Sequence, residues 1–429
     1  MISIIVGLAL LMLLAYLGWS IIWIAPLVSG IVALLSGMNI LESYTGTYME
    51  GFVDFAKAYF PIFLFGAIFG KLMEDTGAAQ SVAYKISNLI GEKRAILGML
   101  ISAAILTYGG VSLFVVVFAV YPLAVAMFRQ ANVSRKLLPS TFVLGAFTFT
   151  MTALPGTPQI QNIIPINTFK TSTMAAPILG IVAGLIMAVG GYFYLKFREK
   201  QLKKNGEEFT EPKGSNEVKS INEDELPNWI LSVIPLIAVV VTLNAFENLS
   251  ILIALGIGIL LIMLFNIKNY KQFIKAINGG ASGSVMATIN TSAAVGFGSV
   301  VTASPGFEAV KDLIFAIPLS PYFSEAFAVQ LLAMITGSAS GGMGIALEAL
   351  GSEYYDIAIN NNLSLEAFHR ITAVASGASI LPHNGALLTL FTVTGLTHKD
   401  SYKDVFVVGL IIPMIATIAI IFLAMMGIN

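Results

Sequence analysis

Four short segments with glycine or proline interrupt apolar stretches of this chain, and they hold the residues best suited to chemistry. They are TYGGVS at 107–112, ALPGTPQIQN at 153–162, GSASGGMG at 337–344 and SILPHNGA at 379–386. Glycine lets backbone approach a ligand closely, and proline ends a helix on its N-terminal side, so unpaired amides and carbonyls are exposed. None of the four contains Lys or Arg. Helix N-termini there would supply amide donors and partial positive charge, which suits a small carboxylate.

We predict that neutral polar groups in these segments bind such a ligand, because hydroxyls and amides can pair with carboxylate oxygens and hydroxyl groups. Plainer explanations exist for each residue. Gly-Pro breaks are often simple kinks, Ser and Thr bond back to their own helix, and Gln159, Gln161 and Asn162 could cap helix ends. The candidates are Thr107, Gly109, Gly110, Ser112, Pro155, Gly156, Thr157, Gln159, Gln161, Asn162, Ser338, Ser340, Gly341, Gly342, His383, Asn384 and Gly385.

His383 is the one ionisable residue inside an interruption, and it is our candidate for proton coupling. Ionisable residues within membranes are usually functional, and histidine titrates near neutral pH. The alternative is a neutral histidine that only shapes the site. Other charged residues fall at predicted membrane edges, where we expect solvated charge; these are Asp54, Lys57, Glu325, Glu348 and Glu366.

The composition of the 429-residue chain calls for a lipid environment. It is 57% hydrophobic and 11% charged, against about 25% charged residues in soluble domains. Apolar stretches near the roughly 20 residues that a helix needs to cross a bilayer recur along the whole length. We therefore predict an all-α polytopic membrane protein, because lipid offers no partner to unpaired backbone groups. The apolar start has no preceding positive charge, so we expect a retained span rather than a signal peptide.

Several functional classes are disfavoured by the composition. A net charge of −1 gives no basic field for nucleic acid, and the absence of cysteine excludes disulfides and thiolate sites. No Walker-type phosphate loop occurs, so we expect coupling to an ion gradient rather than to ATP. The three histidines are too dispersed for a helix-based metal site, and we expect no cofactor. An intramembrane enzyme, which would need a buried acid, base or metal pair, and a channel are the alternatives from other classes.

Two apolar stretches are broken by glycine in a way that disfavours a single crossing. Residues 95–128 would form one helix about 50 Å long at 1.5 Å per residue, too long for a bilayer without extreme tilt. We expect two re-entrant hairpins that each enter and leave on one side. The breaks are at Gly109 and Gly110 in 95–128, and at Gly337, Gly341, Gly342 and Gly344 in 323–347.

With these hairpins the chain divides into two halves of five spans, each with a discontinuous helix. An odd number of spans inverts the second half relative to the first. The polar linker between them lacks apolar periodicity, so we expect it to be solvated and mobile. The predicted boundaries are 1–196 for the first repeat, with a hairpin at 95–128 and a broken helix at 137–164, 197–227 for the linker, and 228–429 for the second repeat, with a hairpin at 323–347 and a broken helix at 367–396.

The basic residues favour this topology. If the linker is cytoplasmic, every Lys and Arg lies inside except Lys57, Lys170, Lys311 and Arg370, as the positive-inside rule requires. Both termini are then predicted outside, in a multi-pass protein of the cell (inner) membrane.

An internal duplication leads to the same layout. Short matches recur in order at nearly constant spacing, and paired interrupted segments in inverted repeats are typical of secondary transporters, with the substrate near the midplane. The matches pair Gly70 with Gly298, Thr76-Gly77 with Pro305-Gly306, Gly109-Gly110 with Gly341-Gly342, and Leu154-Pro155 with Leu381-Pro382.

Over nearly its whole length the chain resembles the gluconate permease family of the ion transporter superfamily. The similar motifs are GGVSLFVVVFAVYPLA at 109–124, LPSTFVLGAFTFTMTALPGTPQIQNIIP at 138–165 and ASILPHNGALL at 378–388. The resemblance implies a proton-coupled symporter of small hydroxy or keto carboxylates such as 3-hydroxybutyrate or gluconate. It also implies an elevator mechanism, in which a mobile domain carrying the hairpins and broken helices slides along a static homodimeric scaffold.

The departures from the family pattern bear on the substrate. Gluconate carriers typically have a His-Pro-rich break where this chain has ALPGTPQIQN, so the similarity favours the branch associated with hydroxybutyrate-type acids. Sodium-coupled transport of citrate-like di- or tricarboxylates is the alternative, although the Ser-Asn-Thr signatures of such carriers are not evident at the hairpin tips.

Overall fold

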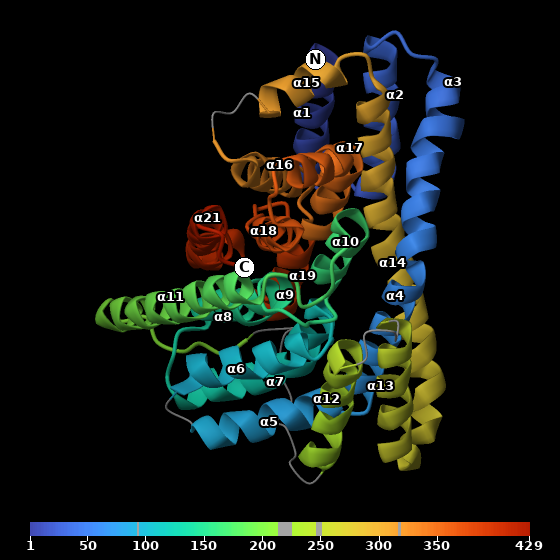
Figure 1. Cartoon of the computed structure of the whole chain (residues 1–429). Helices are drawn as coiled ribbons and strands as arrows, with labels where there is room; N and C mark the ends of the chain where they lie inside the picture. Colours follow the sequence, from blue (N-terminus) through green and yellow to red (C-terminus); the bar gives the residue numbers. More distant parts are fainter. Residues whose placement is uncertain (92–93, 213–224, 246–250, 316–318) are drawn as a thin grey trace.

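The structure, a computed structural model, describes residues 1–91, 94–212, 225–245, 251–315 and 319–429 (Figure 1). Within these ranges all regular secondary structure is helical, as the composition predicts. Five helical stretches in the described chain are long and apolar enough to cross a membrane. They are Ile40–Asp75, Leu113–Gln130, Pro177–Lys204, Ile267–Ala303 and His398–Met425.

Outside the interrupted stretches each half forms further helices, most of them long and apolar. Apolar side chains on all faces suit helices that lie in lipid or in a protein core. The first half has α1 (Ile2–Tyr16), α2 (Ile21–Leu35), α3 (Ile40–Glu42), α4 (Met49–Asp75) and α11 (Pro177–Lys204); the second has α12 (Trp229–Ala245), α13 (Ile251–Phe265), α14 (Tyr270–Ala303), α20 (His398–Phe406) and α21 (Ile412–Met425).

Both predicted hairpin stretches are broken into two helices, as the glycines indicate. The first consists of α6 (Ala95–Tyr108) and α7 (Leu113–Gln130), with Gly110 at φ +99° between them. The second consists of α16 (Pro321–Thr336) and α17 (Ala339–Asn360), with Gly337 at φ +64°. These positive φ values favour glycine. The expected break at Gly341, Gly342 and Gly344 is wrong, because all three lie inside α17, where helical φ needs no glycine.

Both predicted broken helices are also discontinuous. In the first half α8 (Leu138–Phe142), a π-helical turn (Val143–Phe147) and α9 (Phe149–Thr152) precede the break, and α10 (Ile160–Phe169) follows it. In the second half α18 (Leu365–Gly377) ends before Leu381-Pro382, and α19 (Gly385–Thr394) begins after it. Proline explains both breaks, since it cannot donate to the helical ladder.

Two helices of nine or more residues in the described chain lie entirely outside the predicted spans. They are α5 (Ala78–Ile90), between α4 and α6, and α15 (Phe307–Phe315), between α14 and α16. Each is short and has apolar residues along one face only, so a search for long apolar runs passes over it.

Helices α4 and α14 form a column that joins the two halves (Figure 1). Glycine permits their close approach, as is common between membrane helices. A Cβ at Gly280 would lie 2.7 Å from the Cα of Ile68, and one at Gly296 would lie 2.7 Å from the carbonyl oxygen of Tyr48. Both hairpins extend from one side of this column, with α18 between them in the view of Figure 1.

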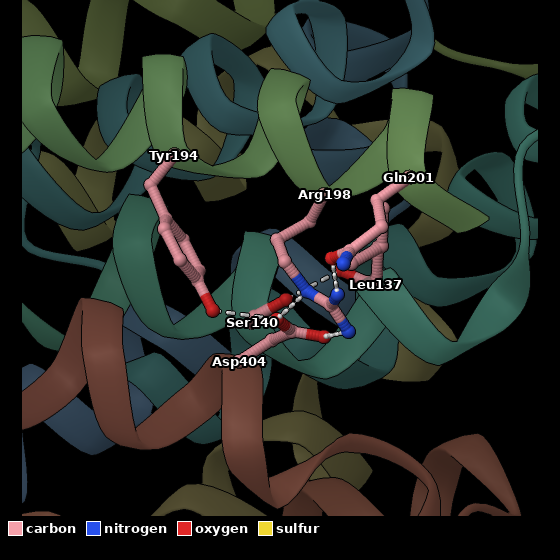
Figure 2. Close-up of polar contacts among 6 residues, drawn as sticks. All are labelled: Leu137, Ser140, Tyr194, Arg198, Gln201 and Asp404. Atoms are coloured by element: carbon pink, nitrogen blue, oxygen red, sulfur yellow. Dashed lines mark hydrogen bonds and ion pairs between the residues drawn. The ribbon is translucent and has the colours of Figure 1, made fainter. Parts of the chain in front are cut away.

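A polar cluster joins α11 of the first half to α20 of the second (Figure 2). The Arg198 guanidinium donates to Asp404, with Nε 2.5 Å from Oδ1, and the Tyr194 hydroxyl donates to the same Oδ1 at 2.7 Å. The Asp404 side chain is only 3% exposed. Because buried charge is retained where it is paired and hydrogen-bonded, this cluster fixes the two helices to each other.

The linker is only partly described. Helix α11 continues to Lys204, so the start of 197–227 is helical, and residues 213–224 lie outside the described part. The described stretch after α11 contacts the protein surface, and the expected mobility of the linker stays a prediction. Arg129 Nε and Nη2 each donate to Glu211 at 2.6 Å, Asn132 Oδ1 accepts from the amide of Phe209, and Lys136 pairs with Glu207. Arg129 lowers the pKa of Glu211 through these hydrogen bonds.

The contact between the arms of the second hairpin gives a test of this packing. A Cβ at Gly342 in α17 would lie 2.1 Å from the Cα of Ala333 in α16. We expect Gly342→Ala to push the arms apart and to destabilise the fold by about 1–3 kcal/mol. The measurement is the unfolding temperature of purified protein, followed by tryptophan fluorescence.

Gly283→Ala in α14 is the matched control, because a Cβ there meets no atom within 4 Å. Replacing a helical glycine by alanine without a clash gains about 1 kcal/mol, so this variant should unfold at the wild-type temperature or above. If Gly342→Ala unfolds at the wild-type temperature, the close contact between Gly342 and Ala333 is contradicted.

Candidate functional site

The four interruptions meet at one cavity of about 910 Å³. Segments distant in sequence supply its walls: both hairpin tips, both broken helices, and faces of α4 and α14. Ten of the predicted site residues line it. They are Gly110, Ser112, Gln159, Gln161, Ser338, Ser340, Gly341, His383, Asn384 and Gly385.

Four helices begin at this cavity. Their N-cap residues are Ser112 for α7, Gln159 for α10, Ser338 for α17 and Asn384 for α19, and all four line the cavity. The first N–H groups of a helix have no intrahelical partner and carry partial positive charge. The cavity therefore has four sources of positive potential that need no cationic side chain.

Side-chain caps accept hydrogen bonds from some of these N–H groups. Ser112 Oγ accepts from the amide of Val115 at 3.4 Å, and Ser338 Oγ accepts from the amide of Gly341 at 3.1 Å. At α19, Asn384 Oδ1 accepts from the amide of Leu387 at 3.1 Å. A cap satisfies one of the unpaired donors at a helix start, so other amides of each first turn stay available to a ligand.

Gln159 ties the first broken helix to the first hairpin. Its Nε2 donates to the carbonyl of Thr107 at 2.6 Å and to that of Val111 at 3.2 Å. The Tyr108 hydroxyl donates in return to the carbonyl of Pro155 at 3.0 Å. The carbonyls freed at the hairpin tip are thus satisfied by side chains of the neighbouring break, which holds the two segments as one unit.

His383 makes a similar contact in the second half. Its Nε2 lies 3.2 Å from the carbonyl oxygen of Ile335, near the end of α16, so Nε2 carries the proton of this hydrogen bond. A Cβ at Gly337 would come within 2.7 Å of the His383 ring, and glycine therefore allows the ring to pack on the hairpin tip. His383 is 9% exposed and faces the cavity.

Two of the predicted residues have buried oxygen atoms without a hydrogen-bond partner in the described chain, Gln161 Oε1 and Thr107 Oγ1. Buried polar atoms are rarely left unpaired, and such exceptions often mark a missing ligand or water. Gln161 lines the cavity, whereas Thr107 lies behind the wall. Gln161 is thus placed to accept a hydrogen bond from a ligand.

The other predicted site residues lie behind the cavity wall. Gly109 packs on Leu236 of α12, and the carbonyl of Gly156 accepts from Asn244 Nδ2 at 2.8 Å. These contacts fix the breaks from outside rather than facing a ligand. The predicted residues that do not line the cavity are Thr107, Gly109, Pro155, Gly156, Thr157, Asn162 and Gly342.

Arg370 is a residue that the sequence analysis misplaced. We expected it outside the membrane, but it lies within α18 and is fully buried. Its Nη1 donates to Asn162 Oδ1 at 2.9 Å, and its Nε and Nη2 donate to the carbonyls of Ala175 and Thr173 at 3.0 and 3.2 Å. Arg370 falls inside the predicted span 367–396, and this position could have indicated that its side chain is buried.

Through these bonds, Arg370 joins the two broken helices. Asn162 is in α10, and Thr173 and Ala175 belong to the segment that follows α10. Glu366, one turn earlier in α18, accepts from the amide of Ala176 at 3.0 Å. The planar guanidinium can reach several acceptors at once, which an ammonium cannot.

The cavity also includes a charged group that the sequence analysis placed only on the cytoplasmic side. Lys71 is the one cationic side chain among the lining residues, and its Nζ lies 3.0 Å from Glu74 Oε1 and 2.9 Å from Asp75 Oδ1. Its charge is therefore offset by neighbours on α4. Further polar lining residues outside the predicted set are Asn290, Thr291, Thr336 and Ser379. In the described chain no group of three or more His, Asp or Glu could hold a metal ion.

Comparisons with known proteins identify the family. A sequence model of the GntP family permeases matches residues 1–250. The chain belongs to the GntP permease family. The uncharacterized transporter YxjC of Bacillus subtilis is 41% identical over 96% of each chain. An uncharacterized transporter of Haemophilus influenzae is 26% identical over 79% of this chain and 77% of its own, and an uncharacterized permease of that organism is 28% identical over 51% and 44%.

Membership of the GntP family confirms the resemblance seen in the motifs. Together with the helices long enough to cross a bilayer, it identifies a multi-pass membrane transporter.

Arg370 gives a test of how the site is held together. Arg370→Gln removes a buried charge together with donors to Asn162, Thr173 and Ala175, and we expect a loss of about 3 kcal/mol of stability. The thermal unfolding temperature of purified protein should fall. Lys57→Gln, at an exposed position of α4, is the control and should be neutral. Equal stability of the two variants would refute the role of Arg370.

Proposed function

We propose that this GntP permease is a secondary transporter that takes up a small hydroxy or keto carboxylate, such as 3-hydroxybutyrate or gluconate, together with protons. The observation that supports this most is the meeting of four helix N-termini at one cavity. Amides at helix starts bind carboxylates without a fixed cation. Among the described lining residues Lys71 is the one Lys or Arg, and it is already paired with Glu74 and Asp75.

The cavity also has a partner for a hydroxyl group. In our proposal the carboxylate accepts hydrogen bonds from first-turn amides, while the ligand hydroxyl donates to Gln161 Oε1. That oxygen is otherwise unpaired in the described chain. A ligand with a carboxylate and a hydroxyl would pair with the first-turn amides and with Gln161 Oε1 at the same time. A simple fatty acid lacks the hydroxyl and would leave Gln161 Oε1 unpaired, so we expect the site to prefer hydroxy acids.

We further propose that the coupling ion is the proton and that His383 exchanges it at the cavity wall. The imidazole faces the cavity, its Nε2 is held by the Ile335 carbonyl, and its ionisation would alter the charge beside the bound acid. The sodium-coupled transport of citrate-like acids is the alternative.

Membrane orientation and movement belong to the same proposal. We propose both termini outside, the linker in the cytoplasm, and two inverted repeats. The hairpins and broken helices would move as a unit along a scaffold that pairs with a second copy. The hydrogen bonds of Gln159, His383 and Arg370 support this view, because they tie each break to a hairpin or to the other break. The column of α4 and α14 supplies a rigid surface for the scaffold.

Uptake into proteoliposomes tests the function. Radiolabelled 3-hydroxybutyrate or gluconate should accumulate when the lumen is alkaline, and the uptake should be the same with sodium or potassium salts outside. A sodium requirement would contradict proton coupling, and currents too large for a carrier would favour a channel.

Gln161 tests the hydroxyl contact. We expect Gln161→Leu to weaken the apparent affinity for the hydroxy acid about tenfold, the equivalent of about 1.4 kcal/mol for a lost hydrogen bond. Gln130→Leu, at the exposed end of α7, should leave uptake unchanged. An equal loss of affinity in Gln161→Leu and Gln130→Leu would argue against a direct contact between Gln161 and the ligand hydroxyl.

A further inference from the structure

Glu325 is a carboxyl group for which the cavity offers no explanation. It lies on α16, the first arm of the second hairpin, and is fully buried, although we expected solvated charge at this position. The Thr372 hydroxyl of α18 donates to Glu325 Oε1 in a short hydrogen bond. Glu325 Oε2 has no partner among the described residues. A hairpin arm and a broken helix thus meet at a buried acid with one free oxygen.

Two tyrosines beside Glu325, one on its own helix and one on α17, have hydrogen-bond partners of their own. The Tyr354 hydroxyl, on α17, donates to Ser324 Oγ at 3.2 Å. Tyr322, on α16, accepts from the amide of Ser364 at 2.9 Å. Neither is a cation that could compensate a negative charge on Glu325.

Charged groups on the elements that pack against α16 are engaged elsewhere or exposed. On α18, Arg370 and His369 bond to Asn162, and Glu366 bonds to the amide of Ala176. Helices α1 and α21 contain no Asp, Glu, Lys, Arg or His, and Tyr16 of α1 packs on His383. On α17 and α15, Glu348 bonds to Ser299, Lys311 pairs with Glu308 and Glu353, and Asp356 and Asp312 are exposed.

This environment suits the carboxylic acid and not the carboxylate. An ionised group buried with one hydrogen bond and no cation costs several kcal/mol. The acid needs only a proton on Oε2, the atom that is unpaired. The packing of α16 against α18 therefore requires Glu325 to be protonated.

Both partners of this contact are connected to the cavity. Helix α16 continues to Thr336, and α18 continues from Thr372 to Gly377; both of these end residues line the cavity. Separation of α16 from α18 would admit water to Glu325, and the proton could then leave Oε2 for water. The charge on Glu325 would therefore determine whether α16 stays packed against α18 beside the bound acid.

We propose that Glu325 is a second proton-binding site of the transport cycle, separate from His383, and that Thr372 holds it at the joint between the hairpin and the broken helix. The inference rests on the proposed function for its role in coupling. The proton site itself is independent of the substrate.

Infrared spectroscopy of purified protein tests the proton site without any ligand. The wild type should show a carbonyl stretch of a protonated carboxylic acid at neutral pH. Glu325→Gln should lose this band, and Thr372→Val, which removes the donor but keeps the shape, should shift it to higher frequency. Glu348→Gln, an exposed glutamate of the same hairpin, is the control and should retain it. A band that is absent in the wild type, or that persists in Glu325→Gln, overturns the inference.

Proteoliposome transport of radiolabelled 3-hydroxybutyrate tests the coupling. Glu325→Gln should retain exchange of labelled for unlabelled acid, which needs no net proton movement, and should lose accumulation driven by a pH gradient. Glu348→Gln should keep both. Wild-type accumulation by Glu325→Gln overturns the coupling role. If the wild type does not transport the acid, the substrate class proposed above fails, and the infrared band alone decides the proton site.

Discussion

The structure depends on what becomes of backbone amides where apolar helices are interrupted. In lipid-like surroundings every peptide group needs a partner, and the first turn of a helix leaves several N–H groups unpaired. This chain brings four such helix starts to one cavity; three have a side-chain cap, and α10 has none. Because one cap satisfies only one of the unpaired amides, the other amides need water or a bound group as a partner.

The side chains around the cavity hold these breaks in register. Gln159 and His383 make similar contacts, each with a carbonyl near the tip of a hairpin. Arg370 joins the second broken helix to the first through Asn162 and two carbonyls. These bonds join each break to a hairpin or to the other half of the chain, and most of them have a backbone carbonyl as the acceptor.

The helical architecture and the positions of the interruptions that line the cavity could be predicted from the sequence because both follow from local rules. Apolar length gives the spans, and proline or glycine gives the breaks. Gly341 shows the limit, since it was expected to break a helix and instead lies inside α17, facing the cavity. A glycine selected for close packing has the same sequence signal as one required by a positive φ.

Buried charge was the least predictable feature. Arg370 and Glu325 were both expected at solvated edges, and both are fully buried. Their partners, Asn162 and Thr372, come from other helices, and pairings across distant segments leave no local pattern. The contact of the polar linker with Arg129 also comes from a surface remote in sequence, so the linker residues alone did not indicate it. Intramembrane charge inside a predicted span is the one clue that was available.

The most direct test of the central claim is a thermal-shift comparison of carboxylates with matched neutral compounds on purified protein. A ligand that binds the folded state raises the unfolding temperature. If helix N-termini bind the acid, 3-hydroxybutyrate or gluconate should stabilise the protein, while the corresponding amides and esters should not. Equal stabilisation by the neutral compounds, or none by any short hydroxy, keto or sugar acid, would contradict the account.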